Sequence, residues 1–194
     1  SVFRILNSRE NVSVVAINDI ADNDAMAYLL KYDTVMGPFK DSVSLDGDIM
    51  KTSNNQIKMI AEREPSLLPW KEMAVDVVIE STGIFREKLQ LQQHINAGAK
   101  RVILTVPSKD EIDYTLVIGV NDDGLTADHK IISNASCTTN CLAPMAKILN
   151  DSFGIEYGVI NTIHAYTNDQ RLADVPHSDW RRSRAAAENI IPTT

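Results

Sequence analysis

A polar run of nine residues, 133–141, contains the only two cysteines of the chain, Cys137 and Cys141. The run follows an apolar strand pattern and precedes a helix pattern, so Cys137 is predicted to lie in the first turn of a helix. Backbone N–H groups and the helix dipole stabilise a thiolate there and lower the pKa of the thiol. The same N–H groups, with the hydroxyls of Ser136 and Thr138, can bind a phosphate or a developing oxyanion. This pattern predicts covalent catalysis on a carbonyl group.

A cysteine nucleophile needs a base, and His164 is the candidate. It is predicted at the end of a strand over residues 157–165, where its ring could face Cys137. A lone histidine is more often structural, so spacing alone leaves both interpretations open. Cys141, one helical turn beyond Cys137, is interpreted as a small buried core residue. No metal site is expected, because a Cys-x-x-x-Cys pair needs two further ligands and the chain has four histidines.

These residues need a scaffold, and most of the sequence alternates strand and helix patterns. Strands are predicted at residues 12–17, 75–80, 101–106, 114–120 and 130–133, and helices at 1–10, 22–30, 86–96 and 136–149. Residues 43–61 are predicted to form an antiparallel pair with turns at Asp46-Gly47 and Asn54-Asn55. Such alternation indicates an α/β fold with a doubly wound parallel dinucleotide-binding sheet. Residues 1–135 are assigned to this Rossmann-type domain and residues 136–194 to the start of an α+β catalytic domain, whose polar segment 167–187 is a functional loop.

The ends of the predicted strands carry candidate cofactor contacts. Asp19 follows the strand at 12–17, where an acidic residue usually holds a ribose 2′-hydroxyl, and its charge favours NAD over NADP. Ser81-Thr82-Gly83 and the segment beginning at Thr105 follow two further strands at the edge where such sheets bind ligands. A solvated carboxylate and two ordinary loops are the structural alternatives. The usual G-x-G-x-x-G turn does not occur in the sequence.

Composition narrows the classes of partner. The net charge of -7 gives no electrostatic case for nucleic acid as a main partner. A cluster of arginines, Arg181, Arg182 and Arg184, fits a small anion better than a polynucleotide. No apolar run approaches the ~20 residues that span a bilayer, so no membrane role is expected. Two cysteines do not form a disulfide framework, which predicts a reducing, cytoplasmic location.

Several motifs together resemble those of the glyceraldehyde-3-phosphate dehydrogenase family. They are the run around Cys137, residues 162–170 (TIHAYTNDQ), 30–34 (LKYDT), 80–83 (ESTG) and the tail 184–194 (RAAAENIIPTT). The resemblance implies that Cys137 attacks the aldehyde of glyceraldehyde 3-phosphate to give a thiohemiacetal. It also implies that His164 activates the thiol and assists hydride transfer to NAD, and that inorganic phosphate cleaves the resulting thioester. The implied product is 1,3-bisphosphoglycerate, within glycolysis and gluconeogenesis.

The resemblance assigns further residues to binding. Ser136 and Thr138 match residues that bind the attacking phosphate, and Thr167 and Arg182 match residues that line the substrate-phosphate region. Matches to cofactor contacts are Asp19, Arg63 and Thr105. In the family the loop over about residues 165–188 packs near a neighbouring subunit's cofactor, which implies a homotetramer.

The sequence departs from the family pattern at both ends. The family's opening strand and Gly-rich turn would precede Ser1, and a Thr-Gly pair, a further substrate-binding arginine and most of the catalytic-domain sheet would follow Thr194. A partial chain is the favoured interpretation. Two alternatives stay open: erythrose-4-phosphate dehydrogenase, which shares the cysteine and histidine chemistry, and a non-catalytic fragment that only binds nucleotide or partners. Comparing turnover of the two aldehydes tests the first alternative, and an intact mass near 21.5 kDa would favour the second.

Overall fold

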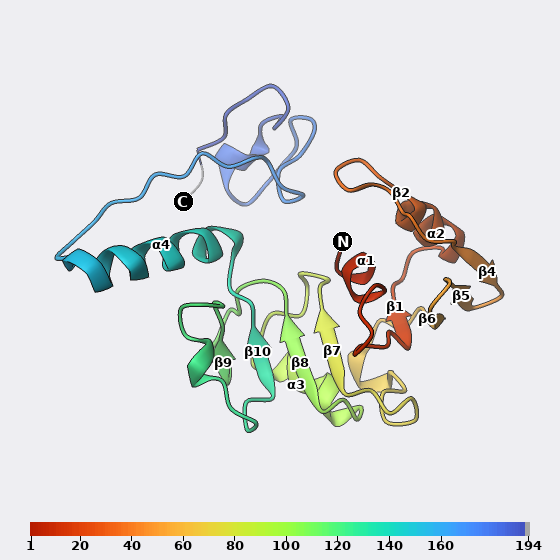
Figure 1. Cartoon of the computed structure of the whole chain (residues 1–194). Helices are drawn as coiled ribbons and strands as arrows, with labels where there is room; N and C mark the ends of the chain where they lie inside the picture. Colours follow the sequence, from red (N-terminus) through yellow and green to blue (C-terminus); the bar gives the residue numbers. More distant parts are fainter. Residues whose placement is uncertain (193–194) are drawn as a thin grey trace. The chain divides into compact units, whose positions relative to one another are not determined.

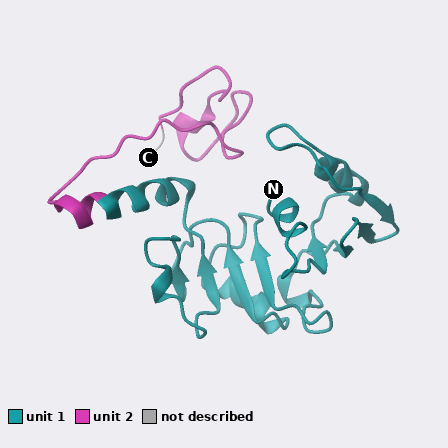
Figure 2. Cartoon of the chain, in the orientation of Figure 1, with its two compact units in different colours: residues 1–148 teal, residues 149–194 magenta. Residues whose placement is uncertain are grey.

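The computed structural model describes residues 1–192. The chain divides into two compact units, the first over Ser1–Ile148 and the second beginning at Leu149 (Figure 2). Thr193 and Thr194, the last two residues of the tail motif, lie outside the described residues. The division falls inside a long helix, α4 (Cys137–Phe153), rather than at residue 135. The domain boundary at 135/136 therefore stays a prediction.

The first unit contains a four-stranded parallel sheet, with α3 (Lys88–Asn96) packed along it (Figure 1). Its order is β7 (Val77–Glu80), β8 (Arg101–Leu104), β10 (Ile131–Ser133) and β9 (Tyr114–Thr115). Side chains from these elements form the larger core, in which Leu91, Val102 and Leu104 are fully buried. Because all strands run in parallel, the loops after them meet at one edge. The predicted α/β fold with a parallel sheet is confirmed.

A second sheet, with the order β1-β6-β5-β4, is mixed. It consists of β1 (Ala16–Asn18), β6 (Gln56–Ile60), β5 (Ile49–Lys51) and β4 (Ser44–Asp46), and only β1 and β6 are parallel. The prediction of two antiparallel strands over residues 43–61 was wrong in the number of strands, since the segment forms three strands joined by two turns. Helix α2 (Asn23–Lys31) begins as predicted after Asp22, whose carboxylate accepts the N–H of Ala25 at 3.0 Å.

Short elements complete the first unit. They are α1 (Val2–Leu6), the hairpin of β2 (Tyr32–Asp33) and β3 (Gly37–Pro38), and the 3₁₀ turns η1 (Pro65–Leu67) and η2 (Asp122–Gly124). The predicted strand at 114–120 stops after Thr115. The Asn121 side chain accepts the N–H of Val117 at 2.8 Å and donates to the carbonyl of Thr115 at 2.9 Å. These backbone groups are therefore bonded to a side chain and not to a neighbouring strand, and the strand ends.

Asp113 ties β9 and β10 to α3. Its carboxylate accepts a hydrogen bond from Lys88 Nζ at 2.9 Å and from the N–H groups of Lys130 and Ile131 at 2.9 and 3.0 Å. Burial opposes ionisation of Asp113, but these bonds outweigh it and lower its pKa to about 2. A lowered pKa stabilises the fold above the ordinary value of 3.8, and this contribution is lost as the pH falls from there through about 2.

We therefore expect Asp113→Asn to lower the free energy of unfolding by about 1–2 kcal/mol at pH 7, allowing for solvent screening of this partly exposed group. The difference from the unmodified protein should shrink below pH 4, become small near pH 2 and vanish below it. Denaturant titrations at several pH values measure it. Asp123→Asn removes the same charge from an exposed position and is the control. An equal loss at pH 7 and at pH 2 would refute the linkage.

The second unit has no strand among its described residues. The strand predicted at 157–165 was wrong: its backbone pairs with no other described segment, and Tyr157, Val159 and Ile163 are at least 89% exposed. A strand pattern forms a strand only where a partner supplies the ladder hydrogen bonds. The loop predicted from residue 167 is confirmed as irregular, apart from the 3₁₀ turn η3 (Trp180–Ser183).

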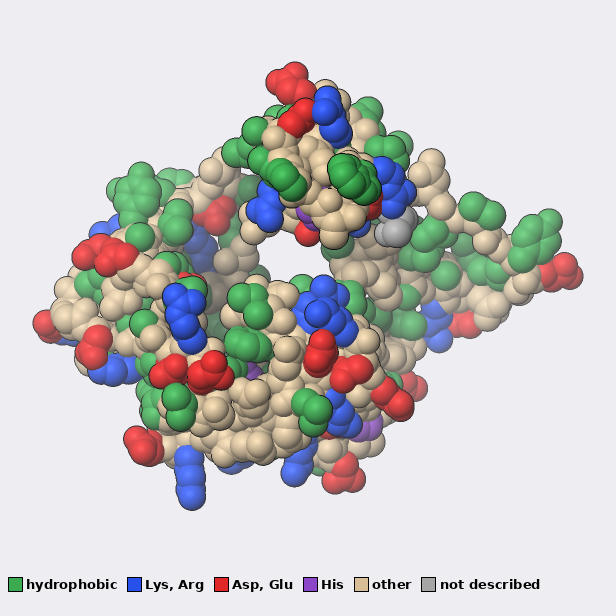
Figure 3. All heavy atoms as spheres, turned by 180° about the vertical axis from the view of Figure 1, so that it is seen from behind, with side chains coloured by type: hydrophobic (Ala, Val, Ile, Leu, Met, Phe, Trp, Pro, Cys, Tyr) green, Lys and Arg blue, Asp and Glu red, His purple; other side chains and the backbone are tan. Residues whose placement is uncertain are grey.

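Charged side chains of both signs intermingle on the face drawn in Figure 3. Several form exposed ion pairs, such as Lys100 Nζ with Asp76 at 2.6 Å and Lys51 Nζ with Asp46 at 2.6 Å. None of the helices in residues 1–192 is long and apolar enough to cross a membrane.

Candidate functional site

Cys137 is the first residue of α4, four residues after the end of β10, as the sequence predicts. The chain turns at Ala135, which is buried and has φ +56°, a left-handed conformation that is uncommon for a residue with a Cβ. Two bonds fix this turn: Ser133 Oγ accepts the N–H of Ala135 at 3.0 Å and donates to the carbonyl of Val106 at 2.8 Å. The turn places the helix start at the carboxyl edge of the parallel sheet.

Ser136 acts as the N-cap of α4. Its Oγ accepts the N–H of Thr139 at 3.0 Å and lies 2.7 Å from Thr139 Oγ1. Asn140 closes the first turn, because its Nδ2 donates to the carbonyls of Asn134 and Ser136 at 2.8 and 3.0 Å. The predicted phosphate ligand Ser136 thus already has a structural role, and half-buried Thr138 lies beside it in the same helical turn.

Both cysteines are exposed, and they form no disulfide. The prediction that Cys141 is a buried core residue was wrong. No side chain of α4 is buried within residues 1–192, because the helix carries its apolar residues into solvent, with Ile148 66% exposed and Phe153 84% exposed. Accessibility therefore does not distinguish Cys137 from Cys141, whereas position at the helix start does.

Two of the predicted cofactor residues follow neighbouring parallel strands. Asp19 comes directly after β1, and its Oδ1 accepts the N–H of Ala21 at 2.9 Å. Arg63 is exposed, three residues after β6. The Asn18 side chain joins the two segments, since it accepts the N–H of Glu62 and donates to the carbonyl of Glu62, both at 2.9 Å. The amide group thus continues the β1–β6 ladder beyond its last backbone pair and holds the loop that bears Arg63.

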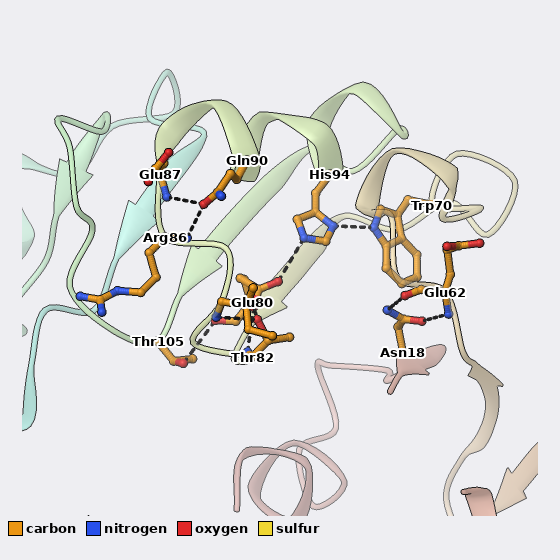
Figure 4. Close-up of polar contacts among 11 residues, drawn as sticks. Asn18, Glu62, Trp70, Glu80, Thr82, Arg86, Glu87, Gln90, His94 and Thr105 are labelled. Carbon is orange, nitrogen blue, oxygen red and sulfur yellow. Dashed lines mark hydrogen bonds and ion pairs between the residues drawn. The ribbon is translucent and has the colours of Figure 1, made fainter. Parts of the chain in front are cut away.

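Thr105, the third predicted cofactor residue, lies after β8 at the edge of the other sheet. Its N–H and its Oγ1 both donate to the carbonyl of Glu80, at 3.0 and 3.2 Å. The loop 81–83 after β7 lies beside it, held by Thr82 against the Glu80 carboxylate (Figure 4). The two segments predicted to contact a cofactor are therefore joined through one buried residue.

His164 belongs to the second unit and is exposed. Its Nδ1 lies 2.6 Å from the carbonyl oxygen of Ala165. A carbonyl only accepts, so Nδ1 carries the hydrogen. In the neutral ring, Nε2 therefore has the lone pair that can accept a proton. Cys137 and His164 lie in different units, and their pairing stays a prediction.

The second unit also contains Thr167 and Arg182. The N–H of Thr167 donates to Gln170 Oε1 at 2.9 Å, which closes a tight turn. Arg182 is paired with Asp169, and its Nε lies 3.6 Å from Asp179 Oδ2. The hydrogen bond from Arg182 is the main cause that lowers the pKa of Asp169. A phosphate at Arg182 would therefore compete with a carboxylate that is already in place.

The other two arginines of the basic cluster have carboxylate partners as well. Arg181 pairs with Asp179 at 2.9 Å and Arg184 with Asp174 at 2.5 Å. These ion pairs close the loop on itself, together with a backbone bond from Ala186 to the carbonyl of residue 171 at 2.8 Å.

Comparison with known proteins agrees with this arrangement. The family model described as the NAD-binding domain of glyceraldehyde 3-phosphate dehydrogenase matches residues 1–88, and the model of the C-terminal domain matches residues 136–194. The chain belongs to the glyceraldehyde-3-phosphate dehydrogenase family. Residues 1–88 are thus part of a domain that binds NAD.

Curated glyceraldehyde-3-phosphate dehydrogenases are similar over nearly the whole chain. That of Borreliella burgdorferi is 56% identical over 200 residues, covering 100% of this chain and 59% of the relative. Those of Streptomyces coelicolor and Thermotoga maritima are 53% and 52% identical, covering 98% and 100% of this chain. The chain spans 56% and 58% of the length of these two relatives.

Three residues that hold the candidate site were not predicted from the sequence. Asn18, Ala135 and Asn140 hold the loops and the helix start through hydrogen bonds or an unusual backbone angle. Asn18 was recognisable from the Asn-Asp pair at a strand end, because a short amide side chain often bonds to nearby backbone. Glu80 and His94 were not recognisable, since their contact joins positions 14 residues apart.

Proposed function

We propose that the complete protein oxidises and phosphorylates glyceraldehyde 3-phosphate with NAD, forming 1,3-bisphosphoglycerate, with Cys137 as nucleophile and His164 as base. The observation that carries the proposal is the position of Cys137: an exposed thiol at the first residue of a 17-residue helix, at the carboxyl edge of the parallel sheet. The names of the relatives support the choice of aldehyde.

In the proposed reaction Cys137 Sγ bonds to the aldehyde carbon while His164 takes the thiol proton on Nε2. Electron density moves onto the aldehyde oxygen, where the N–H groups at the start of α4 stabilise it. Bound NAD would supply the hydride acceptor that oxidises the thiohemiacetal carbon to the thioester. Phosphate then attacks the thioester carbon, and Cys137 Sγ leaves as thiolate, which a helix start favours. Ser136, Thr138, Thr167 and Arg182 are proposed to bind the two phosphate groups.

The residues present suit NAD. Asp19, Thr82 and Thr105 supply a carboxylate and two hydroxyl groups at strand ends, and such groups bind ribose hydroxyls and amides. One carboxylate oxygen of Asp19 accepts a backbone bond, and a carboxylate has further acceptor capacity. The negative charge of Asp19 would repel the 2′-phosphate of NADP. Arg63 is proposed as a further contact from the adjacent loop.

Self-association as a homotetramer and a cytoplasmic location belong to the proposal. Leu172 and Trp180 in the loop after residue 167 are 76% and 86% exposed, which supports burial of this loop in an assembly. A catalytic thiol works only while it stays reduced, which supports a reducing compartment. Light scattering on the protein at its natural full length tests the assembly.

The experiment that tests the function compares two aldehydes in that full-length protein. We expect kcat/KM for glyceraldehyde 3-phosphate, with NAD and inorganic phosphate, to exceed that for erythrose 4-phosphate by at least about tenfold. A preference for erythrose 4-phosphate would reassign the substrate. Absence of turnover with either aldehyde would contradict the proposal.

Alkylation tests the nucleophile separately. We expect iodoacetamide at neutral pH to modify Cys137 about ten times faster than Cys141, because only Cys137 lies at the helix start where a thiolate is stabilised. Peptide mass spectrometry at short reaction times measures both rates in one sample. Both thiols are exposed, so Cys141 is an internal control for access. Equal rates would count against Cys137 as an activated nucleophile.

A further inference from the structure

Three buried polar side chains form a hydrogen-bonded line beneath the loop 81–83 (Figure 4). Trp70 follows η1, His94 is on α3, and Glu80 ends β7; their exposed fractions are 5%, 4% and 4%. Trp70 Nε1 donates to His94 Nδ1 at 3.1 Å, and His94 Nε2 lies 3.2 Å from Glu80 Oε2. Three separate elements therefore meet in one hydrogen-bonded line.

This line has a single direction. The indole N–H only donates, so His94 Nδ1 must accept, and the hydrogen of the neutral ring is on Nε2. That hydrogen is donated to Glu80, where the line ends on a carboxylate. Burial opposes ionisation of Glu80, but hydrogen bonds from His94 and Thr82 outweigh it, and the pKa of Glu80 lies below its ordinary value.

The same residue holds both candidate cofactor segments. Glu80 Oε1 accepts the N–H and the Oγ1–H of Thr82 at 2.7 and 2.6 Å. The Glu80 carbonyl accepts the N–H and Oγ1–H of Thr105 at 3.0 and 3.2 Å. Thr82 Oγ1 also accepts the N–H of Ile84 at 3.1 Å, so the bond to Glu80 shapes the whole turn over residues 81–84.

We propose that Glu80 is a positioning residue of the NAD site, which acts through Thr82 and Thr105 and is itself held in place by His94 and Trp70. The proposal rests on the NAD site of the proposed function. It adds that the orientation of the two threonines depends on a buried glutamate, whose carboxylate accepts from Thr82 and His94 and whose carbonyl accepts from Thr105.

Glutamine is therefore not a conservative replacement at this position. If its amide nitrogen faces His94, the ring must turn its lone pair to Nε2, and Nδ1–H then faces the indole N–H of Trp70. If its nitrogen faces Thr82, it meets the backbone N–H of Thr82. Either orientation leaves two donors opposed in a buried site, and an unsatisfied buried donor is destabilising.

The test uses the full-length protein with Glu80→Gln and, as control, Glu72→Gln, which removes the same charge from an exposed position. Calorimetric titration measures the Kd for NAD, and hydrogen exchange of the cofactor-free protein measures the Thr82 N–H. We expect Glu80→Gln to raise the Kd about tenfold and to speed the exchange, while kcat at saturating NAD changes less than about threefold. Glu72→Gln should change neither quantity.

Thr82→Val is the second variant, and an unchanged Kd in it contradicts the inference even if Glu80→Gln does not fold. It removes the Oγ1 bond to Glu80 and should raise the Kd about threefold, while Thr82→Ser keeps that bond and should retain the original Kd. Unchanged Kd in folded Glu80→Gln, or in Thr82→Val, would overturn the inference. Absence of NAD binding by the unmodified protein would instead contradict the proposed function itself, so the two failures are distinguishable.

Discussion

Replacing Cys137 by serine is expected to reduce turnover of glyceraldehyde 3-phosphate by about 10³-fold or more, because a serine hydroxyl is a far weaker nucleophile than the thiolate of the proposed mechanism. The exposed position means that the fold tolerates the change, and the free energy of unfolding should move by less than about 0.5 kcal/mol. Steady-state kinetics and a denaturant titration on the same preparation measure both quantities.

Cys141→Ser is the matched control, since it makes the same chemical change one helical turn away on the same helix. Turnover should stay within about twofold of the unmodified value. The Kd for NAD should be unchanged in both variants, which separates loss of chemistry from loss of cofactor. Retention of more than a tenth of the activity by Cys137→Ser would rule out this cysteine as the nucleophile.

The largest expected effect on stability comes from Gly98→Ala. Gly98 follows α3 with φ +113°, and a Cβ there would lie 2.4 Å from Lys71 Cβ and 2.6 Å from the Lys71 backbone nitrogen. The backbone cannot move away easily, since the Lys71 N–H donates to the carbonyl of Ala97 at 3.0 Å. Left-handed strain and steric overlap together should lower the free energy of unfolding by about 3 kcal/mol. Thermal and denaturant unfolding measure it.

Gly119→Ala separates the two causes. Gly119 has φ +80°, and a Cβ there would meet nothing within 4 Å, so alanine adds backbone strain without overlap. Its expected cost is about 1 kcal/mol. Equal losses at Gly98 and Gly119 would show that the approach to Lys71 contributes nothing.

Local patterns in the sequence were sufficient for much of the parallel sheet. The strands at 75–80 and 101–106 and the helix at 86–96 have β-branched runs, helical spacing and a glycine stop that act within a few residues. The prediction failed where a distant partner decides the outcome. Residues 157–165 have a strand pattern, but no described segment pairs with them. At 114–120 one side chain, Asn121, replaces the ladder and ends the strand early.

The candidate site divides in the same way. The placement of Cys137 at a helix start followed from a strand pattern, a short polar run and a helix pattern, which are all local. The line from Trp70 through His94 to Glu80 could not be predicted, because each residue looks ordinary in its own segment. Only the fold brings a turn, a helix and a strand end to one buried point. Arg182 illustrates another limit, since its ion pair with Asp169 depends on how the loop closes.

The hydrogen bond from Trp70 to His94 also gives the protein an optical signature. The chain has two tryptophans, and Trp180 is 86% exposed whereas Trp70 is 5% exposed. A polar quencher in solution should reach the exposed indole of Trp180 but not the buried indole of Trp70. The emission that survives quenching should therefore come from Trp70. The Trp70 indole is hydrogen-bonded to the imidazole of His94, which in turn contacts the Glu80 carboxylate. We therefore expect the emission of Trp70 to respond to changes in the hydrogen-bonded line beneath the loop 81–83.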